Sequence, residues 1–260
     1  MKTYQDFLEV AEKSDRERME FVLSAINNHK DSDLYKQAVI AKEYDAHRNV
    51  TIANFQKLLY TLNGKVIPDN YSPNYKLRSN FFANFITQET QYLLGNGVTL
   101  KEAANKEKLG ASFDVRLQDA AHAALVGGVS YGFWNLDHLE VFDVTEFVPI
   151  LDEENGALRS GIRFWQVSDT KPLRATLYEP DGFTQFIRRS GKNMEILEAK
   201  RGYVSVEASS EADGTEILAY QNYPGFPIIP LYGNRARQSE LVGQREAIDC
   251  YDLIKSGFAN

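Results

Sequence analysis

Residues 224–260 read PGFPIIPLYGNRARQSELVGQREAIDCYDLIKSGFAN, and this stretch takes the chain from a strand to a helix. Pro224 to Pro227 make a turn, and residues 228–232 are a short apolar run. We expect an amphipathic helix to begin near Ser239, with five apolar side chains at helical spacing: Leu241, Ile248, Tyr251, Ile254 and Phe258. Because this apolar stripe is still in register at Asn260, we expect that it contacts another subunit or that the rest of the protein is missing.

The segment before residue 128 has the periodicity of helices. Met19, Val22 and Ile26 form one apolar stripe, and Ser32 and Asn49 are candidate caps for the two helices that follow. The expected helices cover residues around 19–26, 33–48, 49–62, 80–94, 101–108 and 112–126. Glycines end two of them, at residues 95–97 and 127–128.

After Gly128 the period changes from helical to alternating. Strands are expected over residues 129–136, 139–142, 147–151, 161–167, 173–178 and 183–188, with turns at 155–156, 180–182, 190–193 and 212–214. Because no helix separates these strands, they indicate an antiparallel β meander. The sequence therefore predicts an α+β fold, with N-terminal helices, then a sheet, then one long terminal helix.

Composition places the chain among ordinary globular proteins. It has 260 residues, of which 43% are hydrophobic and 12% aromatic, and its formal net charge is −7. That charge argues against a protein that grips nucleic acid through a dominant positive field, although DNA could still pass beside it. The single cysteine, Cys250, excludes an internal disulfide framework, and we expect it to be a small buried group on the terminal helix.

One short motif suggests catalysis. Gly128 to Gly132 match the G-x-S-x-G pattern that exposes a nucleophilic serine, here Ser130, in hydrolases. In those enzymes a strand precedes the turn and a helix follows it, whereas here the expected order is reversed. We therefore interpret Ser130 as part of a helix-to-strand turn.

Other reactive residues show no catalytic or metal-binding pattern. The four histidines, at 29, 47, 122 and 138, lack metal-ligand spacing with one another or with Cys250. Three carboxylates at 152–154 precede Asn155-Gly156, where a hairpin tip offers no cleft to separate their pKa values. We expect no catalytic residue, no metal and no cofactor.

Several stretches, taken in order, resemble the portal proteins of tailed bacteriophages, in the branch found in long-tailed phages of Gram-positive hosts. Residues 80–86 and 92–98 are similar to a family helix that ends in a Tyr-Leu-x-Gly-Asn-Pro-Val type segment, with Gly97 where proline is common. Residues 127–132, 148–152 and 162–165 follow, and 44–47 fall where such proteins carry a tyrosine-rich approach to the first conserved helix. Residues 226–234 resemble an Ile-Pro-hydrophobic stretch with its asparagine, and 248–252 an Ile-Asp-x-Tyr-Asp core.

The resemblance implies a structural subunit of a homo-oligomeric ring, usually a dodecamer, at one vertex of the capsid. Double-stranded DNA would pass through the ring during packaging and ejection without sequence-specific binding. The implied partners are terminase, scaffolding and head-completion proteins at the head-tail connector. The implied location is the virion, and the host cytoplasm during assembly, with no membrane involved.

The resemblance also implies a division of the chain. Residues 1–48 would be an N-terminal helical segment, 49–232 a wing-like α+β domain, and 233–260 the start of the stem helix, with the clip and crown absent. The five apolar residues of the terminal stripe would contact neighbouring subunits. Two other functions remain open at this point: a hydrolase that uses Ser130, and a monomeric interaction domain that docks through its C-terminal helix.

Overall fold

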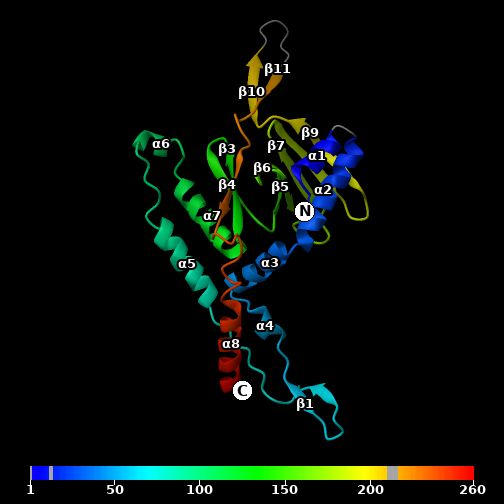
Figure 1. Ribbon diagram of the computed structural model, residues 1–260, viewed down its shortest axis with the longest axis vertical. Helices are drawn as coiled ribbons and strands as arrows, with labels where there is room; N and C mark the ends of the chain where they lie inside the picture. The colour runs from blue at the N-terminus through cyan, green and yellow to red at the C-terminus, as the bar shows by residue number, and fades with distance from the viewer. Residues whose placement is uncertain (1, 12–13, 210–215) are drawn as a thin grey trace.

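The computed structural model describes residues 2–11, 14–209 and 216–260, and over these ranges the chain is an α+β fold (Figure 1). Helices come first, antiparallel sheets follow, and one helix ends the chain, which confirms the predicted fold class. The expected turn at 212–214 lies outside the described residues. Among the helices described, none is both long and apolar enough to span a membrane.

The helices of the described residues are α1 (Tyr4–Ala11), α2 (Asp15–Asp31), α3 (Asp33–Asp45), α4 (Val50–Asn54), α5 (Phe81–Leu94), α6 (Ala103–Glu107), α7 (Phe113–Gly127) and α8 (Arg245–Ala259). The strands are β1 (Leu58–Tyr60), β2 (Val66–Pro68), β3 (Val129–Asn135), β4 (His138–Asp143), β5 (Phe147–Leu151), β6 (Leu158–Trp165), β7 (Leu173–Glu179), β8 (Gly182–Arg188), β9 (Met194–Arg201), β10 (Val204–Ser209), β11 (Glu216–Gln221) and β12 (Ile228–Tyr232).

The strands form two sheets and two separate hairpins. Strands β5 to β9 pair in sequence order, so the meander is confirmed for β5 to β8, whereas β9 was not predicted and the predicted strands β3 and β4 lie in another sheet. The second sheet has the order β12-β3-β4, so the apolar run after Pro227 returns to pair with a strand from the middle of the chain. The pairs β1–β2 and β10–β11 are two-stranded hairpins that project from opposite ends of the molecule (Figure 1).

The sheets and helices stack in layers. Helices α1 and α2 cover one face of the five-stranded sheet through a core that includes Phe21, Ile26 and Ile162. The three-stranded sheet packs on the other face through a second core that includes Tyr131, Phe142 and Phe147. On the outer side of that sheet lies α7, where the Ser130 hydroxyl donates to the Ala120 carbonyl at 2.7 Å.

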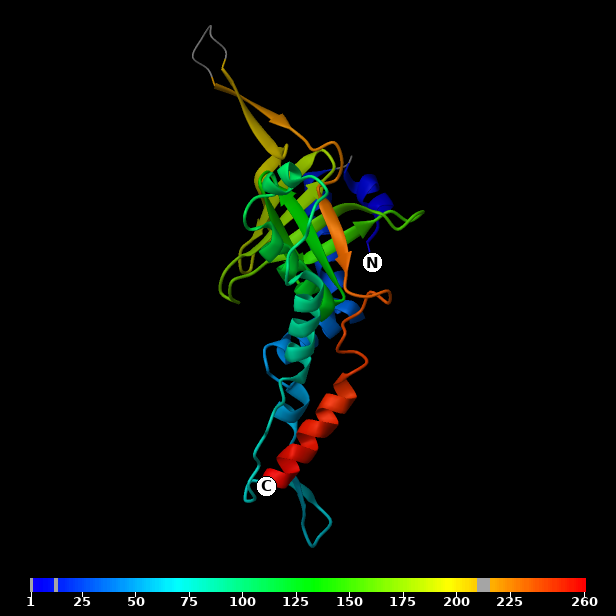
Figure 2. The same ribbon diagram turned by 90° about the vertical axis from the view of Figure 1, so that its left-hand side faces the viewer.

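The two views show a broad upper part and a narrow lower part. The sheets, α1, α2 and α7 make the upper part, and α4, the β1–β2 hairpin and α8 extend below it (Figures 1 and 2). Helix α5 descends along one side to meet α8 (Figure 1). The lower part contains no sheet beyond the β1–β2 hairpin.

The predicted helix caps Ser32 and Asn49 are confirmed. The Ser32 hydroxyl accepts from the Tyr35 amide at 3.3 Å, and the Asn49 side chain accepts from the Ile52 amide at 3.0 Å. Gly128 ends α7 in the left-handed conformation, with φ of 90°.

The predicted helix over 49–62 is wrong beyond Asn54. After α4 the chain becomes extended, and Leu58–Tyr60 pair with Val66–Pro68 around Gly64, whose φ is 75°. The Asn63-Gly64 pair therefore acts as the turn of a hairpin instead of a helix stop. Apolar spacing alone could not separate the two readings, because this segment packs on nothing that would fix a helical face.

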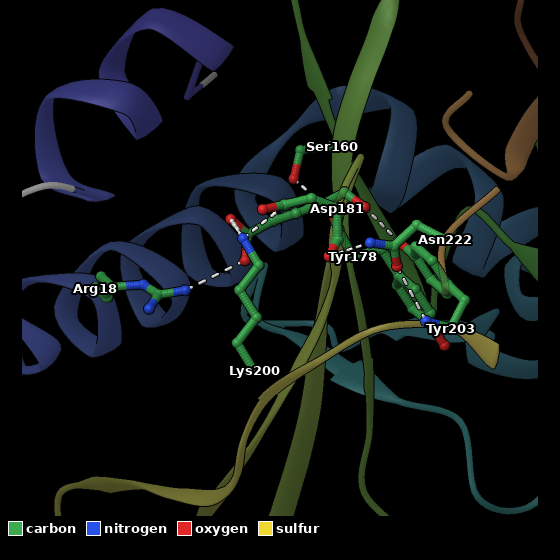
Figure 3. A network of polar contacts seen from close by, with 8 residues as sticks. Arg18, Ser160, Tyr178, Asp181, Lys200, Tyr203 and Asn222 are labelled. Carbon is green, nitrogen blue, oxygen red and sulfur yellow. Dashed lines mark hydrogen bonds and ion pairs between the residues drawn. The ribbon is translucent and has the colours of Figure 1, made fainter. Parts of the chain in front are cut away.

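A polar network ties α2 to the five-stranded sheet (Figure 3). The Glu179 carboxylate, at the end of β7, is buried and accepts from Arg18 of α2 at 3.2 Å and from Lys200 of β9 at 3.0 Å. The Tyr203 hydroxyl donates to the Glu179 carbonyl at 2.5 Å, and Asn222 donates to the Asp181 carbonyl at 3.0 Å. This network holds the base of the β10–β11 hairpin against the sheet, because residues on both sides of that hairpin take part.

Two histidines have pKa values displaced in opposite directions. His29 is buried under the sheets and donates from Nε2 to the Val144 carbonyl at 2.7 Å, and its burial lowers its pKa. His122 of α7 lies 3.0 Å from the Asp45 carboxylate, and this hydrogen bond raises its pKa. Protonation therefore opposes folding at the first site and favours it at the second.

We expect Gly161→Ala to destabilise the fold. A Cβ at residue 161 would lie 2.0 Å from the Phe147 ring, which is already packed at 4.4 Å from the Tyr131 ring. Overpacking of this kind costs about 1–3 kcal/mol of unfolding free energy, measurable by urea denaturation. Gly225→Ala is the control, because a Cβ there meets no atom within 4 Å. Equal stability of the two variants would contradict the packing described here.

The two histidines predict the pH dependence of stability. A histidine in the unfolded chain has a pKa of about 6.5. The pKa of His29 is lower in the folded chain than in the unfolded chain. His29 therefore leaves the free energy of unfolding unchanged above about pH 6.5 and lowers it increasingly as the pH falls below that value. The pKa of His122 is higher in the folded chain than in the unfolded chain. His122 therefore adds its whole stabilising contribution to the free energy of unfolding below about pH 6.5, and this contribution is lost as the pH rises through the folded pKa.

Denaturation midpoints of His29→Gln and His122→Gln, measured across this pH range, test both signs. The first variant should lose part of the acid-side decline, and the second should lose part of the decline toward alkaline pH. A change of slope in the same direction in both variants would overturn the assignment.

Candidate subunit-contact surface

A buried hydrogen-bonded cluster attaches α8 to the corner between α3 and α4. The Tyr44 hydroxyl lies 2.5 Å from the Asp249 carboxylate and 3.1 Å from the Thr51 hydroxyl. The Asn49 side chain donates to the Asp252 carboxylate at 2.8 Å. These contacts join residues more than 200 positions apart in the chain, so they fix where the terminal helix leaves the upper part.

The chemistry of the cluster determines its donors and acceptors. Burial and the hydrogen bond to Asp249 raise the pKa of Tyr44, so its hydroxyl stays protonated. That single proton goes to the carboxylate, because the contact with an ionised acceptor is the strongest one present. Thr51 then donates to the Tyr44 oxygen, and the oxygen of the Asn49 amide accepts from the Ile52 amide at the start of α4.

Asp252 is the most buried member of the cluster. Its residue is 0% exposed, and Asn49 is the hydrogen-bond donor to its Oδ2 atom. Within the described residues its Oδ1 atom has no hydrogen-bond partner. A carboxylate so placed costs free energy unless its remaining contacts are good, which makes its donor Asn49 important for the docking of α8.

Apolar packing supports the same attachment. Leu241 and Ile248 are buried at 3% and 5% exposure, in a core shared by α3, α5, α7 and α8. The other buried members of this core are Ala41, Tyr44, Phe82, Ile86, Leu125 and Val126. The first two positions of the predicted terminal stripe therefore belong to the fold of the single chain.

The expected start of the terminal helix is wrong by six residues. Residues 240–244 are turns, and α8 begins at Arg245. The Glu240 amide donates to the Leu125 carbonyl at 3.1 Å, and the buried Ser239 hydroxyl accepts from the Leu241 amide at 3.1 Å. These bonds hold the segment against the end of α7, and their geometry is not that of a helix.

The lower half of α8 is held by an extended segment. The Ser256 hydroxyl accepts from the Leu77 amide at 2.9 Å, and the Asn260 side chain accepts from the Tyr75 amide at 2.6 Å and donates to the Tyr75 carbonyl at 3.2 Å. One side of the helix is thereby covered by its own chain. Beside this covered side, the Phe81 ring of α5 contacts the Tyr251 ring edge-on at 5.0 Å between centroids but leaves Tyr251 46% exposed.

The opposite side of α8 exposes apolar side chains. Tyr251, Ile254 and Phe258 are 46%, 54% and 89% exposed. An open groove of about 570 Å³ lies between α5 and α8, lined mainly by Phe81, Phe85, Ala247 and Tyr251. The β1–β2 hairpin adds more exposed apolar side chains: Leu58, Tyr60, Leu62, Val66 and Ile67. Apolar surface gathered in this way marks a contact site on a protein.

Two further expectations can be compared with the structure. Cys250 is exposed, so the expectation that it is buried is wrong; it lies on the outer side of α8, between the inward-facing Ile248 and Asp252. Ser130 is 0% exposed, and its hydroxyl is engaged by the Ala120 carbonyl, which is not the geometry of an exposed nucleophile. Among the described residues no group of three potential metal ligands occurs.

Sequence reasoning missed the role of Tyr44 and Asn49. The signal was present as Asp249 and Asp252, which are three residues apart on one helix face; Asp249 directly follows the buried Ile248, and Asp252 lies one helical turn after Ile248. The sequence could not supply their partners, because these come from the other end of the chain. Asn49 was identified as a helix cap, and the structure gives it a second contact.

We expect Tyr44→Phe to loosen α8. Loss of the hydroxyl removes the hydrogen bond to Asp249, which retains the Arg245 guanidinium at 3.6 Å, and costs about 1–3 kcal/mol of unfolding free energy. Amide hydrogen exchange in residues 245–259 should accelerate more than exchange in β5–β8. Tyr71→Phe is the control, because Tyr71 is 89% exposed. Unchanged exchange in α8 would contradict the cluster's role.

Comparison with curated protein sequences gives no match. A family model described as phage portal protein, SPP1 Gp6-like, matches residues 23–260. The matched range begins inside α2 and includes the rest of the upper part, the hydrogen-bonded cluster of Tyr44, Asn49, Asp249 and Asp252, and all of α8. The chain therefore belongs to the SPP1 Gp6-like family of phage portal proteins, a structural family.

Proposed function

We propose that this chain is a structural subunit of the portal ring at a capsid vertex, and that its lower part makes the contacts between subunits. The observation that carries the proposal is the exposed apolar surface of α8, α5 and the β1–β2 hairpin, on a helix that is firmly attached to its own chain. Family membership supports a portal role and implies assembly into a ring.

The placement of the apolar surfaces favours a ring over a closed dimer. Helix α5 and the β1–β2 hairpin lie on opposite sides of α8 (Figure 1). Two different surfaces on opposite sides of a subunit suit a head-to-tail contact, and head-to-tail contacts close into rings when the rotation between subunits permits. Twelve subunits is the number that the family resemblance suggests.

Within this proposal the parts of the chain have distinct roles. Residues 1–48 and 49–232 form the wing, and residues 233–260 begin the stem. Leu241 and Ile248 anchor the stem to the wing, and Tyr251, Ile254 and Phe258 face a neighbouring subunit. Terminase, scaffolding and head-completion proteins would meet the assembled ring, in which the subunit would have a structural and not a catalytic role.

The charge of the chain suits a passage for DNA. Each phosphate that a protein neutralises releases counterions and adds affinity, which would slow a moving duplex. A subunit with net charge −7 has little such affinity overall. We propose that double-stranded DNA passes through the ring during packaging and ejection without sequence-specific binding.

The proposal predicts that Ile254→Asp combined with Phe258→Asp prevents assembly and leaves the fold intact. Both side chains are more than half exposed, so the unfolding midpoint should stay near that of the wild type, whereas burying two added charges should weaken association about tenfold or more. Light scattering after size-exclusion chromatography, over a range of chain concentrations, measures the oligomer.

Two controls distinguish assembly from folding. Val167→Asp places a charge at a residue that is 83% exposed in the β6–β7 connection, and it should change neither property. Ile248→Asp places a charge in the shared core and should lower the unfolding midpoint. A wild-type chain that stays monomeric at every concentration, or an equal loss of assembly in Val167→Asp, would contradict the proposal.

A further inference from the structure

A polar recess opens beside α2, far from α8. It has a volume of about 280 Å³ and is formed by three separate elements: one face of α2, the β6–β7 connection and the β8–β9 turn. Its apolar floor is made by Leu23, Ile26 and Leu173, and polar side chains surround the opening. The recess shares no residue with the exposed apolar surface of α8 and α5.

The lining of the recess is basic, although the chain as a whole is acidic. Four cationic side chains line it, namely Lys30 from α2, Lys171 from the β6–β7 connection, Arg188 from the end of β8 and Arg189 from the β8–β9 turn. The one carboxylate in the lining is Asp169. A local excess of positive charge on a chain of net charge −7 needs a reason in the chain's function or its contacts.

Most of these cations are not neutralised within the chain. Arg189 pairs with Glu195. Over the ranges that the structure describes, Lys30, Lys171 and Arg188 have no carboxylate within 4.0 Å. The Lys30 ammonium instead lies 5.2 Å from the centre of the Phe164 ring. Three cations from three elements therefore line one recess, and the single carboxylate in its lining, Asp169, is not paired with any of them over the described residues.

We propose that this recess binds a phosphate group. Several converging cations fit a ligand with more than one negative charge and several acceptor oxygens, and two of them are arginines, whose planar donors match phosphate oxygens. The Ser190 hydroxyl, in the same turn, adds a neutral donor. The apolar floor excludes water from one side of the bound group and strengthens its attraction to the cations. A single carboxylate would neutralise only part of this charge.

The ligand's source is either free phosphate, including a phosphate monoester, or the backbone of a nucleic acid. The test uses the full chain and measures the binding of inorganic phosphate by calorimetry and of a short fluorescent DNA duplex by anisotropy. Saturable phosphate binding without duplex binding identifies a free phosphate group. Binding of both, with competition between them, identifies a backbone phosphate. Either result supports the proposal.

Three variants make the test specific. Lys171→Glu combined with Arg188→Glu should weaken binding about tenfold or more, because two charge-assisted contacts are lost. Asp169→Asn should strengthen binding, and a merely destabilised chain would not give this opposite sign. Lys101→Glu combined with Lys108→Glu, at exposed residues on either side of α6, is the charge-matched control and should change nothing.

Two results would overturn the proposal. In the first, phosphate binds no better than acetate or an oligoglutamate peptide at equal ionic strength, which would indicate an acidic protein partner instead. In the second, the Lys171 and Arg188 double variant binds as the wild type does, or phosphate fails to bind and the duplex binds equally to all variants. Assembly of the ring is measured separately, so failure here leaves the proposed function untouched.

Discussion

The attachment of α8 to the corner between α3 and α4 is the constraint on which the lower part of the molecule depends. Tyr44 and Asn49 meet Asp249 and Asp252 there, next to a core that joins α3, α5, α7 and α8. A helix held at its first turns by buried hydrogen bonds and apolar packing leaves in one direction only. Its exposed side chains are therefore presented at fixed positions relative to the sheets, which an assembly of identical subunits requires.

The upper and lower parts of the chain differ in whether their apolar side chains are buried or exposed. The upper part buries them between layers, with aromatic rings in contact across the two sheets. The lower part leaves many of them exposed on α5, α8 and the β1–β2 hairpin. A monomer that keeps such a surface in water is at risk of non-specific association, which supports the proposal that a neighbouring subunit covers it. The exposed Cys250 lies on this helix as well.

The charged side chains are distributed unevenly over the molecule, which the net charge alone does not reveal. The chain is acidic as a whole, which suits passage of DNA, while the recess beside α2 concentrates cations from three elements. One buried charge elsewhere in the chain is paired twice, because Glu179 accepts from both Arg18 and Lys200 (Figure 3). In the recess, by contrast, Lys30, Lys171 and Arg188 have no carboxylate within 4.0 Å over the described residues.

The sequence by itself determined much of the local structure: most helices from their apolar stripes and caps, strands β5 to β8 of the meander from their alternation and turns, and the portal family from ordered motifs. It failed where a local pattern had two readings, as at Asn63-Gly64, or where a helix start depended on a distant carbonyl, as at residues 239–245. Only the tertiary structure decided that β12 pairs with β3, that Asp249 and Asp252 bind Tyr44 and Asn49, and that Leu241 and Ile248 face inward while Ile254 and Phe258 remain exposed. The reason is that periodicity marks which residues are apolar, whereas burial depends on which distant element arrives to cover them.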